Sequence, residues 1–87
     1  MAVFNVVEEL VKLRVKEMFE KETEMCTCER CFEDVVAVAC NSLPPKYIAT
    51  PTGEVFEKIK YAKLQKTIDV NTAVYKAMKQ VRENPHH

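Results

Sequence analysis

Three cysteines in the first half of the chain are the residues whose type and spacing most directly indicate chemistry. Cys26, Cys28 and Cys31 form the pattern C-x-C-x-x-C within the segment EMCTCERC. Thiolates at such short spacings can converge on one metal ion, and zinc takes four nitrogen or sulfur ligands in a tetrahedron with Zn–S distances of about 2.3 Å. The spacing therefore predicts three ligands of a structural zinc site. A fourth protein ligand would leave the zinc no open coordination position for catalysis.

The fourth ligand must come from elsewhere in the chain, and the candidates are Cys40, His86 and His87. Cys40 stands nine residues after Cys31 on a predicted helix. That spacing corresponds to roughly 13 Å along the helix axis, too far for two ligands of one ion. We therefore expect Cys40 to be a buried apolar thiol. We expect a terminal histidine as the ligand, with His87 preferred over His86.

Two alternatives to a metal site stay open. The thiols can be unliganded, with the terminal His-His pair a remnant of a purification tag. The pair Cys28-x-x-Cys31 can instead be redox-active. Such a pair outside the strand-to-helix turn of a thioredoxin-like unit is, however, weak support for redox chemistry.

A second informative segment is NSLPPKYIATPTG, residues 41–53. Pro44 and Pro45 end the preceding helix and fix the direction in which the chain leaves it. Lys46 and Tyr47 therefore stand next to each other on stiff backbone, where a cation and an aromatic ring can bind a flat, phosphate-bearing ligand. The alternative is that Tyr47 covers the core and that Lys46 is solvated.

Four helices are expected to position these residues. Apolar residues recur at three- and four-residue steps in residues 5–21, 29–42, 54–67 and 70–84. Asn5 is the predicted N-cap of the first helix, with Glu8 completing a capping box, and Asp69 is the predicted N-cap of the fourth.

The connection after the second helix is predicted to be extended and to return to the cysteine end. The third helix would then descend, and the fourth would ascend and bring the C-terminus back to the cysteines. The fold class is therefore all-α, a small four-helix domain over residues 1–87, with a zinc site at the connection between the first two helices.

The composition argues against several classes of function. The chain has 87 residues, of which 47% are apolar, and a single glycine, as expected for one small helical domain. Thirteen basic and thirteen acidic residues cancel, which disfavours nucleic acid as a partner, although lysines give residues 58–66 a locally basic face. Neither a Gly-rich phosphate loop nor a hydrolase triad pattern occurs, so we do not expect an enzyme.

The expected location is the cytoplasm. The segment MAVFNVVEEL carries acids where a signal peptide needs basic residues, and no apolar run approaches the ~20 residues that span a bilayer. In a reducing compartment, clustered cysteines are metal ligands more often than structural disulfides.

Several motifs together resemble those of the ComFB family, the late competence development proteins of bacteria. They run through nearly the whole chain: N-x-x-x-E (Asn5, Glu9), CTCERC, Asp34, ACNSLPPKY, TGEVF, Gln65, Asp69 and NPHH. The resemblance implies a small all-helical homodimer with a zinc ion near the cysteines, and it places the fourth ligand at His87. It also implies a signalling role, because members of the family have been described as receptors for the second messenger cyclic di-GMP.

Two functions compete under this resemblance. The first is a cyclic di-GMP receptor, whose expected ligand site consists of Asn41, Pro44, Pro45, Lys46, Tyr47, Lys60 and Tyr61. The second is a zinc-stabilised adaptor that binds another protein and has no small-molecule ligand. The excess of apolar residues between positions 3 and 15 favours a dimer or partner face under either hypothesis. Position 46 is lysine where the family pattern more often has arginine, and lysine lacks the planar, bidentate fork of arginine.

Overall fold

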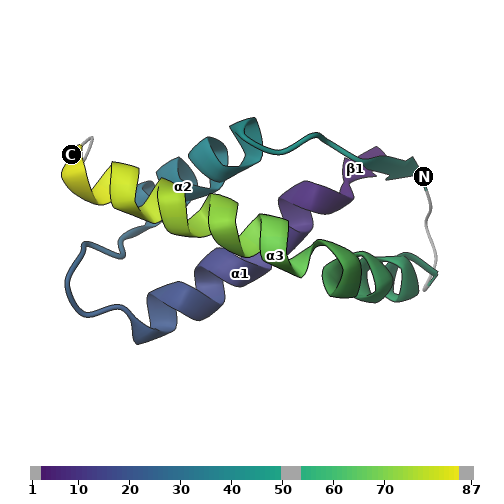
Figure 1. Ribbon diagram of the computed structural model, residues 1–87, viewed down its shortest axis with the longest axis horizontal. Helices are drawn as coiled ribbons and strands as arrows, with labels where there is room; N and C mark the ends of the chain where they lie inside the picture. Colours follow the sequence, from purple (N-terminus) through teal and green to yellow (C-terminus); the bar gives the residue numbers. More distant parts are fainter. Residues whose placement is uncertain (1–2, 50–53, 85–87) are drawn as a thin grey trace.

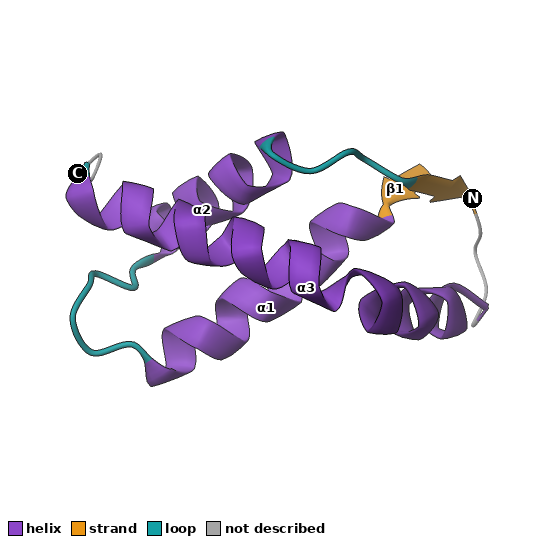
Figure 2. Ribbon diagram, viewed as in Figure 1, coloured by secondary structure: helices purple, strands orange, loops and turns teal. Residues whose placement is uncertain are grey.

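The computed structural model describes residues 3–49 and 54–84, and their side chains except those of Phe4, Ile48 and residues 54–68. These residues form three helices and two short strands, in the order β1 (Val3–Asn5), α1 (Val6–Lys21), α2 (Glu29–Asn41), β2 (Tyr47–Ala49) and α3 (Glu54–Glu83). Helices α1 and α2 run in opposite directions, and α3 lies across both of them (Figure 1). Helices dominate the secondary structure, so the predicted all-α class is confirmed (Figure 2).

The number of helices differs from the prediction. Residues 54–83 form one helix of 30 residues, α3, where two helices divided at Asp69 were expected. The segment contains neither proline nor glycine, and an aspartate inside a helix costs only about 0.7 kcal/mol relative to alanine. That cost is too small to end a helix, so the four-helix prediction is wrong for the described part of the chain.

The path of the chain also differs from the prediction. The segment after α2 does not turn back toward the cysteines but continues to β2, which pairs with β1 at the start of α1. The chain then returns along α3, which ends at the same end of the long axis as the connection between α1 and α2 (Figure 1). The C-terminal end of α3 thus reaches the cysteine end in one pass instead of two.

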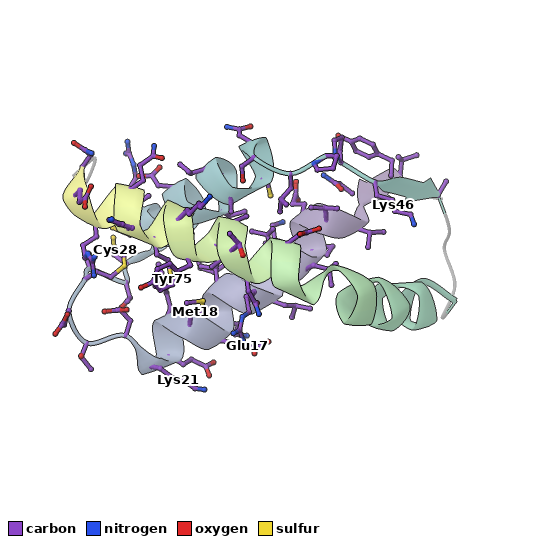
Figure 3. All side chains as sticks on the ribbon, in the orientation of Figure 1. Glu17, Met18, Lys21, Cys28, Lys46 and Tyr75 are labelled. Atoms are coloured by element: carbon purple, nitrogen blue, oxygen red, sulfur yellow. The ribbon has the colours of Figure 1, made fainter. Side chains whose placement is uncertain are left out.

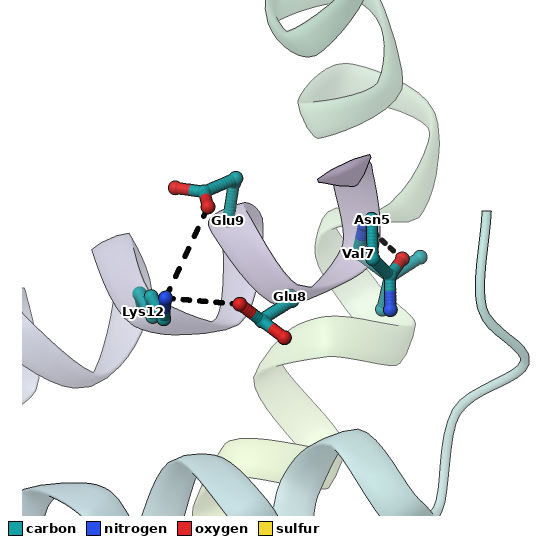
Figure 4. A network of polar contacts seen from close by, with 5 residues as sticks. All are labelled: Asn5, Val7, Glu8, Glu9 and Lys12. Carbon is teal, nitrogen blue, oxygen red and sulfur yellow. Dashed lines mark hydrogen bonds and ion pairs between the residues drawn. The ribbon is translucent and has the colours of Figure 1, made fainter. Parts of the chain in front are cut away.

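Helix α1 begins at the predicted cap. The Oδ1 atom of Asn5 accepts a hydrogen bond from the Val7 backbone N–H at 3.0 Å, which satisfies one of the free donors of the first turn (Figure 4). Glu8, expected to complete a capping box, contacts Lys12 Nζ at 2.9 Å. The carboxylate of Glu9 lies 4.0 Å from the same ammonium group.

The ends of α2 follow the sequence closely. Cys28 is its N-cap, and at the other end the Ser42 hydroxyl donates to the Ala39 carbonyl at 2.8 Å. The two prolines that follow cannot continue a helix, because proline lacks the N–H donor and restricts the residue before it. The chain therefore leaves α2 in an extended conformation and reaches β2.

Strands β1 and β2 form an antiparallel pair that the sequence did not predict. Val3 lies opposite Ala49, and Asn5 lies opposite Tyr47. Each strand has only three residues, too few for a period-two pattern to stand out from the helical pattern that follows. The pairing brings the Pro-Pro segment against the start of α1.

The core lies between the three helices. Its buried side chains come from all of them and form one cluster of mostly branched aliphatic residues: Val6, Leu10, Val11, Val15, Cys31, Val35, Val36, Ala39, Val70, Ala73, Val74, Ala77, Met78 and Val81. The stripe predicted for residues 70–81 is buried throughout, which confirms that part of the helical pattern. None of the helices, over the residues described, is long and apolar enough to cross a membrane.

Much of the apolar surplus of α1 is used inside the chain. Val6, Leu10, Val11 and Val15 are buried, and Val7 packs partly buried against the same cluster. Leu13, within the same helix, is 46% exposed. Val3 is exposed as well, so Val3 and Leu13 are the described apolar side chains of this segment that a partner can reach most readily.

Candidate metal centre

The loop that carries Cys26 and Cys28, residues 22–28, is held between α1 and α2, and Cys31 follows in the first turn of α2. The ring of Phe19 near the end of α1 meets the ring of Phe32 at the start of α2 edge to face, with centroids 5.9 Å apart and an interplanar angle of 78°. Met25, in the loop itself, packs partly buried against the core. These contacts bring the ends of the two helices together and fix where the loop begins and ends.

The thiols of the two loop cysteines and of Cys31 converge. The Sγ atoms of Cys26, Cys28 and Cys31 all lie within 4.8 Å of one another. Sulfurs around a tetrahedral zinc stand about 3.8 Å apart, given Zn–S bonds of about 2.3 Å. The distances between the three Sγ atoms thus exceed those of a zinc-bound site by at most about 1 Å, a difference that side-chain rotations can remove. The cluster can hold a metal ion.

The local backbone favours the thiolate form of Cys28. As the N-cap of α2 it accepts a hydrogen bond through Sγ from the Cys31 backbone N–H at 3.5 Å. This bond, aided by the neighbouring Cys26 thiol, lowers the pKa of Cys28 below its ordinary value. The positive end of the helix dipole acts in the same direction.

Cys31 has the opposite environment. Its side chain is 1% exposed and belongs to the hydrophobic core. Burial, with a further effect of the two neighbouring thiols, raises the pKa of Cys31 to about 12. A bound cation would favour the thiolate, since metal coordination deprotonates a thiol outright. Cys31 is therefore both a core residue and a metal-ligating candidate.

Cys40 lies away from the cluster, as expected. It is on the uninterrupted helix α2 and packs partly buried against the core. Its pKa is raised by burial and by the nearby Glu8 carboxylate. Among the residues described, Cys26, Cys28 and Cys31 are the group placed to hold a metal ion.

The predicted fourth ligand, His87, and its alternative, His86, lie outside the described residues. The last described turns of α3 lie at the same end of the molecule as Cys28 (Figure 3). His87 therefore stays a prediction.

The residues predicted to bind a planar ligand belong to the end of α2, to the segment that follows it and to α3. Asn41 is the last residue of α2, and Pro44 and Pro45 are exposed in the segment that follows. Lys46 is exposed and Tyr47 is 65% exposed, so Tyr47 does not cover the core. Figure 3 shows Lys46 and Cys28 toward opposite ends of the long axis. Lys60 and Tyr61 belong to α3, but their side chains lie outside the described part.

One contact in this region was not predicted from the sequence. The Lys46 backbone N–H donates to Asn5 Oδ1 at 2.9 Å, across 41 positions of the chain. The cap role of Asn5 was visible in the local pattern. Its second bond depends on the tertiary pairing of β1 with β2, for which a single sequence gives no signal.

The arrangement defines a class of protein, namely a small helical domain with, at one end, a cysteine cluster that can hold a metal ion. Residues 4–85 match the family described as late competence development protein ComFB, so the chain belongs to the ComFB family.

A solved structure described as the structural characterization of the late competence protein ComFB from Bacillus subtilis is similar to this chain, with 26% sequence identity and a TM-score of 0.75. The match covers 97% of this chain and 94% of that one. Comparison with curated proteins gave no match.

Proposed function

We propose that this chain is a non-catalytic signalling protein, a zinc-stabilised homodimer that binds cyclic di-GMP. The ComFB resemblance implies the type of ligand. One observation supports it: Lys46 and Tyr47 present an exposed cation and an exposed aromatic ring on a backbone fixed against the start of α1.

The chemistry of this pair suits a guanine dinucleotide. Tyr47 offers a ring on which a base can stack, a contact worth about 1–3 kcal/mol per base. Lys46 offers a positive charge for a phosphate. A cyclic dinucleotide carries two phosphates, and a homodimer would supply one Lys46 from each chain.

Zinc has a structural role in this proposal. Three cysteine thiolates and His87 would close the tetrahedron and tie the C-terminus to the loop between α1 and α2. Structural zinc can contribute about 10 kcal/mol of apparent binding free energy, which is large for a chain with so small a core.

The homodimer and the alternative, an adaptor without a small-molecule ligand, both draw on exposed apolar side chains. Leu13 on α1 is 46% exposed, and Tyr75 on α3 is 68% exposed. Aromatic and large apolar residues are enriched in protein interfaces. These side chains could meet a second copy of the chain or another protein.

The test is isothermal titration of the zinc-loaded protein with cyclic di-GMP, with cyclic di-AMP as the ligand control. We expect saturable binding of the guanine ligand alone, and a loss of tenfold or more in affinity for Lys46→Ala and for Tyr47→Ala. Lys46→Arg should bind more tightly than the wild type, because its planar fork can bond and stack at once.

Lys79→Ala is the matched control for Lys46→Ala, since Lys79 is also an exposed lysine but belongs to α3. It should bind the nucleotide as the wild type does. Absence of heat at high micromolar ligand would reject the receptor and leave the adaptor.

A further inference from the structure

Asn5 joins two parts of the chain that are distant in sequence. Its Oδ1 atom accepts two hydrogen bonds, from the Val7 N–H at 3.0 Å and from the Lys46 N–H at 2.9 Å. The first bond caps α1 (Figure 4), and the second reaches the Pro-Pro segment. A carboxamide oxygen has two lone pairs, so both bonds can form at once.

The backbone of Lys46 is held on both sides. Its N–H donates to Asn5 Oδ1, and its carbonyl accepts from the Val6 N–H at 2.7 Å. Asn5 also lies opposite Tyr47 in the ladder of β1 and β2. Positions 46 and 47 are therefore fixed by residues 5 and 6.

The side chains at these two positions are not fixed by burial. Lys46 is exposed, and Tyr47 is 65% exposed. Hydrophobic packing therefore contributes little to where the ammonium group and the ring are presented. The backbone contacts decide it, and within the described part of the chain the side chain of Asn5 accepts the hydrogen bond of the Lys46 N–H.

We propose that Asn5 is a positioning residue whose carboxamide holds the Lys46–Tyr47 backbone against the start of α1. If the proposed function holds, the same hydrogen bond also sets where the Lys46 ammonium group and the Tyr47 ring meet the nucleotide; this second part rests on the proposed function. The chemistry requires a side chain with an acceptor at the length of asparagine. Aspartate retains that acceptor, alanine has none, and serine, a good N-cap, carries its oxygen one bond closer to the backbone.

The experiment measures backbone amide hydrogen exchange by NMR in the zinc-loaded protein without nucleotide. In Asn5→Ala the Lys46 amide should exchange about five- to tenfold faster than in the wild type, and in Asn5→Asp it should stay protected. Asn5→Ser keeps a cap on α1, so it serves if the alanine variant does not fold. There the Val7 amide should stay protected while the Lys46 amide exchanges faster.

The proposal is overturned if Lys46 exchanges at the wild-type rate in every folded variant that lacks the carboxamide or carboxylate. A cyclic di-GMP titration then addresses the ligand: affinity should fall about tenfold in the variants with faster Lys46 exchange. Wild-type affinity in those variants would reject positioning of the ligand site by Asn5. If the wild type itself binds no nucleotide, the proposed function fails, whereas exchange at Lys46 still decides the role of Asn5.

Discussion

At the scale of single residues, two of the three cysteines of the candidate metal centre have a second structural role. Cys28 caps α2, and Cys31 fills the core between the helices. A cap fixes the backbone, and a core position fixes the side chain, so both thiols are placed before a metal arrives. Cys26 has neither role and is exposed, which leaves it free to adjust to the ion.

Replacing Cys28 by serine separates metal binding from capping. Serine is a good N-cap, so α2 should keep its start and the metal-free protein should keep its stability to within about 1 kcal/mol. Zinc affinity should fall by a hundredfold or more, because one of the proposed ligands is lost. Zinc competition with a chromophoric chelator measures the affinity.

Cys40→Ser is the matched control for this variant. It should retain zinc at wild-type affinity and show only a modest loss of stability, since Cys40 is partly buried. The opposite outcome, loss of zinc in Cys40→Ser alone, would make Cys40 a ligand and contradict the separation seen along α2.

The pKa values of the thiols predict how zinc binding depends on pH. Burial raises the pKa of Cys31 to about 12, so in the metal-free protein this thiol is protonated at every pH from 6 to 8. Zinc must displace that proton, so affinity should fall about tenfold per pH unit from this residue alone as the pH is lowered. Cys28, whose pKa is lowered, should contribute less at the upper end of the range. Affinity that does not change between pH 8 and pH 6 would argue against thiol ligation.

At the scale of elements, the sequence predicted the ends of α1 and α2 and the buried face of residues 70–81, but not the continuity of α3. The stripes of α2 and of residues 70–81 follow from periodicity because each apolar step of three or four residues places a side chain on the same face. The division at Asp69 was wrong because a cap residue begins a helix only where the preceding backbone leaves the helical conformation. Nothing in the residues around Asp69 makes it do so.

The two strands mark where prediction from sequence ends. Neither Val3–Asn5 nor Tyr47–Ala49 has a local signal for a strand, since each becomes one by pairing with the other. The three cysteines, in contrast, were found from spacing alone, because only five positions separate Cys26 from Cys31 and α2 begins between Cys28 and Cys31.

Substitution of Asp69 distinguishes one long helix from two helices. Inside a helix, Asp69→Ala should raise the free energy of unfolding by about 0.5 kcal/mol, because alanine has the higher helix propensity. If Asp69 capped a separate helix, the same change should lower it by about 1 kcal/mol. Thermal or urea unfolding of the metal-loaded protein measures the difference.

Asn5→Ala, at a true N-cap, supplies the contrast. It should destabilise the protein by about 0.5–2 kcal/mol. Equal destabilisation by both substitutions would restore the four-helix interpretation.

At the scale of the whole molecule, the fold separates its two candidate sites. The molecule measures 38 × 24 × 22 Å, with the cysteine cluster toward one end of the long axis and Lys46 toward the other (Figure 3). Helix α1 runs between the ends, from the cap at Asn5 to the loop that holds the cysteines. A metal ion that joins this loop to the C-terminus would tie together the ends of all three described helices at one side of the core.

The measurement that tests this account most directly is zinc K-edge X-ray absorption of the purified protein, together with the metal content per chain. We expect one zinc per chain, bound by three sulfurs at about 2.3 Å and one nitrogen at about 2.0–2.1 Å, with the nitrogen lost in His87→Ala. A first shell of four sulfurs, or a chain that binds no zinc while remaining folded, would contradict a metal centre made of Cys26, Cys28, Cys31 and His87.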